Sequence, residues 1–285
     1  MKANALNTRI SSWGEGPVWW NDHLTYVDIQ GNKLIRFHPE TGDEKIWEMG
    51  QRIGFALPCE SGRWIWGGDE GIFFLDVETG LSTPVLDPES DLPENRFNDA
   101  GISPDGRLFA GTISMKKITG EASLYRIDSD LDCALVIPNV TNSNGIDWSP
   151  DGRTCYYIDT PTHQVLQFDY ELETGELSNQ SICLSTEGRY EGSPDGMTVD
   201  AEGKLWIAFC HGGCVVRFDP ENGAELAKIE VPATETTSCC FGGPKGRDLY
   251  ITTGVNSKKE EEHGGKIFVI KDAGVGVEQV PFADT

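Results

Sequence analysis

A set of mostly polar residues recurs along this sequence at one fixed distance before a turn. In five segments the position lies seven residues before the residue that precedes the turn glycine, and in the first segment, which lacks that glycine, the count starts from Asp22. The positions are Glu15, Gly54, Asn98, Asn144, Asp195 and Ser238. If the segments are repeats of one unit arranged around an axis, equivalent residues face that axis. The spacing predicts a ring of side-chain oxygens with a gap at Gly54.

Such a ring would bring the carboxylates of Glu15 and Asp195 close to the amides of Asn98 and Asn144. Carboxylates in a narrow channel repel each other, and buried polar groups need partners, so a cation or water must fill the space. These oxygen ligands suit Ca²⁺, Mg²⁺ or Mn²⁺, and Zn²⁺ can bind where water completes the shell. We expect one divalent metal ion on the axis, with its identity open among these four; a polar channel filled by water is the alternative.

The ring residues belong to a unit that repeats six times. A turn followed by a β-rich run begins at Asn21, Glu60, Pro104, Pro150, Ala201 and Pro244. The intervals of about 40 to 50 residues match the period of a propeller blade. Each unit continues with a second apolar run, and most of these runs end in turn residues, which is typical of strands joined by hairpins. The sequence therefore predicts an all-β protein, a six-bladed β-propeller formed by residues 1–285 as a single domain.

The composition argues against several classes of partner. Lys and Arg number 23 against 46 Asp and Glu, which gives a formal net charge of −23. A surface this negative repels phosphate backbones and anionic lipids, so we expect neither nucleic acid nor a membrane as a partner. The opening MKANALNTRI lacks the apolar core of a signal peptide, and we expect a cytoplasmic protein. The eight cysteines include no CxxC pair, and we interpret them as ordinary thiols.

Five segments, taken in order, resemble the senescence marker protein 30, gluconolactonase and luciferin-regenerating-enzyme family. They are GEGPVWW around Glu15, RFNDAGISPDGRLFAGT from Arg96, NSNGIDWSPDG from Asn142, SPDGMTVDAEGKLWIA from Ser193 and TTSCCFGG from Thr236. The resemblance extends from Glu15 to about Lys271. It implies a six-bladed propeller with a metal bound by Glu15, Asn144 and Asp195. It also implies that Arg96 and Asn98 contact the substrate and that Asp195 is the general base.

The resemblance implies a sugar lactonase that opens its substrate to the free acid. In such an enzyme the metal polarises the lactone carbonyl and Asp195 takes a proton from the attacking water. A serine nucleophile is not expected, because the sequence has no Gly-x-Ser-x-Gly elbow. Two alternatives remain open: a non-catalytic metal-binding propeller, and an esterase or phosphotriesterase acting at the same metal. The expected partner is a small-molecule sugar lactone, and the expected assembly is a monomer or a small homo-oligomer.

The sequence departs from the family at two places near the expected substrate. Sugar-lactone members often carry RFNDGKVD, whereas this chain reads RFNDAGI from Arg96 and lacks the lysine. Some relatives place an acidic residue after the Gly-Thr pair, where this chain has Lys116 and Lys117. This replacement predicts that Lys116 binds the substrate, and it favours an acidic aldaro- or sulfosugar lactone over a neutral aldonolactone. The alternative is that both lysines are solvated loop residues.

Overall fold

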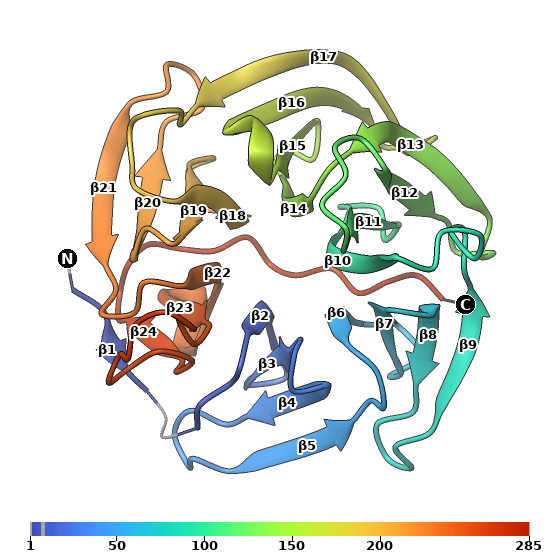
Figure 1. The fold of residues 1–285 in the computed structure, drawn as a ribbon. Coiled ribbons are helices and arrows are strands. Elements are labelled where there is room, and N and C mark those ends of the chain that lie inside the picture. The colour runs from blue at the N-terminus through green and yellow to red at the C-terminus, as the bar shows by residue number, and fades with distance from the viewer. Residues whose placement is uncertain (1, 7–8, 285) are drawn as a thin grey trace.

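Six four-stranded antiparallel sheets surround a central axis in the computed structural model, which describes residues 2–6 and 9–284 (Figure 1). From the axis outwards, blade 1 consists of β2 (Gly14–Trp20), β3 (His23–Asp28), β4 (Lys33–Phe37) and β5 (Glu44–Glu48). Blade 2 consists of β6 (Ile53–Pro58), β7 (Trp64–Gly68), β8 (Gly71–Leu75) and β9 (Ser82–Leu86). Blade 3 consists of β10 (Asn95–Ile102), β11 (Leu108–Ser114), β12 (Ala122–Ile127) and β13 (Cys133–Val140).

The remaining blades follow the same order. Blade 4 consists of β14 (Ser143–Trp148), β15 (Thr154–Asp159), β16 (Gln164–Glu171) and β17 (Glu176–Ser185). Blade 5 consists of β18 (Ser193–Val199), β19 (Leu205–Cys210), β20 (Cys214–Phe218) and β21 (Glu225–Glu230). Blade 6 consists of β22 (Thr236–Gly242), β23 (Asp248–Thr253), β24 (Phe268–Ile270) and β1 (Asn4–Ala5). The predicted all-β, six-bladed propeller is confirmed.

Blade 6 closes the ring with a strand from the other end of the chain. The short strand β1 pairs antiparallel with β24, Asn4 opposite Val269, so the outermost strand of the last blade comes from the N-terminus. The repeat pattern did not indicate this strand, because two residues carry no periodicity. Short 3₁₀ turns occur at Thr160–Thr162 and Pro244–Gly246. Over the described ranges, no helix has the length and apolar character needed to cross a bilayer.

The hydrophobic core lies between the blades. The described residues form six apolar clusters, each joining neighbouring sheets. Between blades 3 and 4, for example, Phe109 of β11 meets Trp148 of β14 edge to face, with ring centroids 5.3 Å apart. Because the middle strands bury both faces in this way, their sequences are nearly continuous apolar runs rather than alternating ones. This packing fixes the inner strands, which carry the axial residues.

Every innermost strand is interrupted by a bulge at the same place. The register against the second strand shifts between Glu15 and Val18 in β2, between Phe97 and Asp99 in β10, and between Pro194 and Met197 in β18. The same shift occurs in β6, β14 and β22. A bulge turns its side chains away from the regular alternation and often adjoins a functional site. The bulges therefore determine which side chains face the axis.

The last residues form a strap over one face of the propeller. In Figure 1 this red segment runs from blade 6 to the C-terminus near β9. It hydrogen-bonds to the turns that follow the innermost strands, with Gly276 N donating to Gly246 O at 2.9 Å and Ala283 N to Gly106 O at 2.9 Å. The strap therefore covers the face opposite the beginnings of the inner strands.

Candidate metal centre

The structure places the six predicted ring positions on the six innermost strands, each at or beside a bulge. The five side chains are at most 9% exposed: Glu15, Asn98, Asn144, Asp195 and Ser238. At the sixth position, a Cβ added to Gly54 would collide with the backbone of Phe97 and Asn98. The gap in the ring thus has a steric cause, since the chains approach too closely there for any side chain.

Glu15 and Asp195 form the negative part of this ring. Burial raises the pKa of Glu15 well above its ordinary value, and the charges of Asp195 and Asp99 raise it further. Burial also raises the pKa of Asp195, and Asp99 adds to this effect. Gly16 N donates to Glu15 Oε2 at 2.8 Å, and the charge of Arg96 also favours ionised Glu15, yet neither compensates for burial. A bound cation would favour the ionised form of both carboxyl groups, so these residues fit a divalent metal.

The two amides are oriented by hydrogen bonds. Asn144 Nδ2 donates to Thr160 Oγ1 at 2.7 Å, and that hydroxyl donates to Pro194 O at 2.9 Å. Asn98 Nδ2 donates to Ser143 O at 2.7 Å and lies 3.3 Å from Asn144 Oδ1. Because its nitrogen is held by Thr160, Asn144 presents its oxygen to the neighbouring ring residues. An amide oxygen fixed in this way can bind a hard cation.

Arg96 lies on β10 beside the ring and is 7% exposed. Its Nη1 donates to Phe97 O at 2.8 Å, whereas its buried Nε finds no hydrogen-bond partner in the described part of the chain. Burial lowers the pKa of Arg96 to about 10, and the neighbouring charge of Arg52 contributes. Arg96 also lines a cavity of about 470 Å³ that includes Arg52 and Asp69. The guanidinium therefore keeps one buried donor without a partner, and Arg96 borders a cavity.

Lys116 is separate from this group. It lies in the turn after β11, its side chain is 58% exposed, and its Nζ is 3.2 Å from Glu94 Oε1. Among the residues described, no ion pair or hydrogen bond connects Lys116 to the ring. Lys117 is exposed in the same turn, with φ of 57°. The role predicted for Lys116 in binding substrate therefore stays a prediction.

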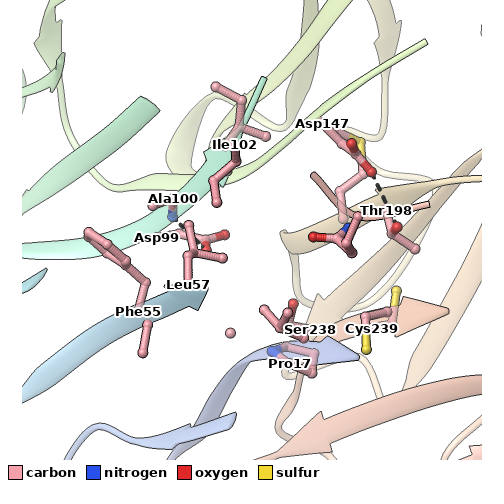
Figure 2. A pocket seen from close by; sticks show the side chains of 18 of the residues that line it. Pro17, Phe55, Leu57, Asp99, Ala100, Ile102, Asp147, Thr198, Ser238 and Cys239 are labelled. Atoms are coloured by element: carbon pink, nitrogen blue, oxygen red, sulfur yellow. Dashed lines mark hydrogen bonds between the residues drawn. The ribbon is translucent and has the colours of Figure 1, made fainter. Parts of the chain in front are cut away.

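Two carboxylates that the repeat pattern did not indicate, the buried Asp99 and the partly buried Asp147, lie next to the ring. Asp99 and Asp147 line a small axial cavity of about 70 Å³, which Gln279 of the strap also lines (Figure 2). Burial raises the pKa of each to about 6. Asp147 accepts hydrogen bonds from Val199 N at 2.7 Å and Trp148 N at 2.8 Å. In the sequence, Asp99 lies one residue after Asn98, and Asp147 lies three residues after Asn144. This proximity to the ring amides is the only sequence feature that could have indicated them.

Comparisons with known proteins identify related sequences. Residues 13–255 match the family model described as the SMP-30/Gluconolactonase/LRE-like region. Regucalcin of Danio rerio is 38% identical over 278 residues, covering 94% of this chain and 92% of the relative. YvrE of Bacillus subtilis, which its name assigns provisionally to the sugar lactone lactonases, is 35% identical and covers 95% of this chain and 94% of its own.

A solved structure supports the same relationship. The calcium-binding protein regucalcin from Agrobacterium tumefaciens superimposes with a TM-score of 0.90 at 27% identity, covering 98% of this chain and 96% of that one. Both sequence and fold are therefore shared over nearly the whole length. On these grounds, the chain belongs to the SMP-30/gluconolactonase/LRE-like family.

Proposed function

We propose that the protein is a metal-dependent lactonase that opens a sugar lactone to the free acid. The observation that carries this proposal is the burial of Glu15 and Asp195 at the axis, where few donors compensate their charge. The YvrE relative, whose name points to sugar lactones, and the regucalcin structure, named as calcium-binding, support the same reaction class and a divalent ion.

The metal ligands in this proposal are Glu15, Asn144 and Asp195. Two carboxylates and an amide oxygen form a hard donor set, which makes Ca²⁺ the first ion to test, followed by Mn²⁺, Mg²⁺ and Zn²⁺. When bound, the ion would supply Lewis-acid polarisation of the lactone carbonyl. Water would complete the shell.

The remaining chemistry belongs to side chains of this chain. Asp195 takes a proton from the water that attacks the carbonyl carbon, and that proton passes to the ring oxygen as its bond to the carbonyl carbon breaks. Arg96 and Asn98 hold substrate hydroxyls, and Arg96 lines the cavity beside the ring. The raised pKa of Asp195 opposes its action as a base in the ion-free protein, so activity should depend on the ion.

A pH-stat assay tests the proposal. Metal-stripped protein is reconstituted with one ion at a time and assayed on neutral and acidic sugar lactones, with an aryl ester and a phosphotriester as comparison substrates. Asp195→Ala should abolish turnover, and Glu15→Gln should weaken metal binding, because each removes one of the two charges that face the ion. Ser238→Ala removes an uncharged ring oxygen and should affect metal affinity least. Wild-type rates after either of the first two changes would exclude the metal mechanism.

Thermal unfolding provides a second measurement. An ion that binds only the folded state stabilises it by RT ln(1 + [L]/Kd), about 2.7 kcal/mol at a hundredfold excess over Kd. Wild-type protein should therefore melt higher with the ion than with chelator, and Glu15→Gln should lose most of this difference. Equal melting temperatures in wild type would favour a water-filled channel.

A further inference from the structure

A second group of metal-ligand side chains lies beside the axial site. Cys210 is the last residue of β19, His211 follows in the turn to β20, and Glu235 comes just before β22 in the neighbouring blade (Figure 1). A backbone bridge pairs Cys210 with Glu235 and holds the two segments together. Cys210 and Glu235 are 7% and 4% exposed, whereas the side chain of His211 is 65% exposed. The side chains of Cys210 and Glu235 are therefore held in place by burial, whereas that of His211 has room to rotate.

The distance between Cys210 and Glu235 already suits two ligands of one small metal ion, and His211 is close to both. His211 Nδ1 lies 2.5 Å from Glu235 Oε2, and Cys210 Sγ lies 3.5 Å from the same oxygen. The three donor atoms lie within 4.8 Å of one another. Tetrahedral bonds of about 2.0 to 2.3 Å place neighbouring donors roughly 3.3 to 3.8 Å apart. A modest rotation of the exposed imidazole, with Glu235 Oε1 turned to the ion, would reach this arrangement.

The charges around Cys210 also favour a cation. Its thiol lies within hydrogen-bonding reach of Glu235. Burial raises the pKa of this thiol, and the charges of Asp195 and Glu235 raise it further. In the described part of the chain, His211 is the one ion-pair partner of Glu235. A divalent ion here would offset a concentration of negative charge that the fold leaves nearly uncompensated.

An acidic loop lies next to this group. A cavity of about 420 Å³ is lined by His211, Thr234 and the run Lys259–Glu262. Thr234 N donates to Glu261 at 2.9 Å, which anchors the loop one residue before Glu235. Lys259 pairs with Glu261 at 3.3 Å, so the charges of Glu260 and Glu262 dominate the cavity. Acidic side chains around an opening raise the local concentration of cations.

We propose that Cys210, His211 and Glu235 bind a second divalent cation, of the zinc class, beside the axial metal centre. Thiolate, imidazole and carboxylate are the ligands that zinc prefers, and water at the fourth position completes the tetrahedron. The axial residues offer only oxygen, so the two sites differ in the ions they select. Cys210 is then a metal ligand, in contrast to our sequence interpretation of the cysteines as ordinary thiols.

Titration of metal-stripped protein with Co²⁺ tests this site directly, because a cobalt–thiolate bond gives a charge-transfer absorption that oxygen ligands do not produce. Wild type should bind two equivalents and develop this band. Cys210→Ser should bind one equivalent without the band, and the matched variant Cys133→Ser, which removes an exposed thiol from β13, should retain both. A band that persists in Cys210→Ser would overturn the proposal.

Two further variants separate this site from the axial one and from loss of folding. Glu15→Gln should keep the band and lose the other equivalent; loss of the band would assign the thiolate to the axial ion and overturn the second site. His211→Asn changes an exposed residue with φ of 66°, a conformation that asparagine tolerates. It should lower Zn²⁺ affinity by at least about a hundredfold, since even outer-shell changes cost 10- to 100-fold. Unchanged Zn²⁺ affinity would overturn the proposal.

Discussion

Uncompensated burial distinguishes the axial carboxylate of Glu15 from other buried carboxylates such as those of Asp200 and Glu89. Asp200 is 1% exposed but receives a hydrogen bond from Trp206 Nε1 at 2.9 Å and pairs with Arg217 at 2.7 Å. Glu89, also buried, accepts from three side chains. Glu15, by contrast, accepts a single backbone hydrogen bond. Since buried polar groups are normally satisfied, a carboxylate left in this state calls for a ligand.

A prediction about a single residue concerns Lys116. If it binds the acidic group of a lactone, Lys116→Ala should lower kcat/KM for that substrate by roughly 10- to 150-fold, because a charge-assisted hydrogen bond contributes about 1.5 to 3 kcal/mol. A neutral aldonolactone should lose little. Glu94→Gln should raise kcat/KM for the acidic substrate, since it releases Lys116 from its present partner.

Steady-state assays of these variants on one acidic and one neutral lactone check this prediction. Lys117→Asn is the matched control, because asparagine tolerates the positive φ of 57° at that position. Small, equal effects of Lys116→Ala on both substrates would leave Lys116 as a solvated loop residue.

At the scale of elements, the repeated turn and inner strand made the ring predictable. Counting back from the turn glycine reached Asn98, Asn144 and Asp195 because each blade keeps the same number of residues between the bulge and the turn. Arg96 came only from family resemblance. The closing strand β1 and the group at Cys210 were not predictable, since both depend on contacts between distant segments. Local patterns therefore indicated the blades and their axial residues, but not what joins the chain ends or the loops.

The C-terminal strap gives a prediction at this scale. Phe282 is fully buried in the cluster between blades 2 and 3, and its N–H donates to Pro58 O at 2.9 Å. Phe282→Ala should lower the free energy of unfolding by about 3 to 5 kcal/mol, because it leaves a cavity in a packed core. Val277→Ala, on an exposed part of the same strap, should change it by less than about 0.5 kcal/mol. Denaturant unfolding measures both, and equal losses would mean that the strap does not stabilise the fold through Phe282.

At the scale of the whole molecule, the propeller gathers acidic groups on its axis as well as on its surface. The net charge is −23, and the buried Glu15, Asp99 and Asp195, with the partly buried Asp147, lie along or beside the central channel. The six interblade clusters hold these groups together against their repulsion. Stability should therefore respond to pH through the axial carboxyl groups, and Asp147, which is not one of the proposed ligands, can be tested separately.

The folded-state pKa of Asp147, about 6, exceeds the ordinary value of 3.8 because burial disfavours its charge. The folded protein then binds this proton more tightly than the unfolded chain, so its contribution to stability is lost as pH rises from about 4 to about 6. Asp147→Asn should remove this dependence, and the variant should gain up to about 3 kcal/mol relative to wild type across that range. Denaturant unfolding of both proteins between about pH 4 and pH 7.5, with chelator present, measures the difference. The substitution also alters hydrogen bonds, but this effect shifts the free energy of unfolding equally at every pH and leaves its slope against pH unchanged. Parallel curves for the two proteins would show that Asp147 ionises as readily in the folded protein as in water.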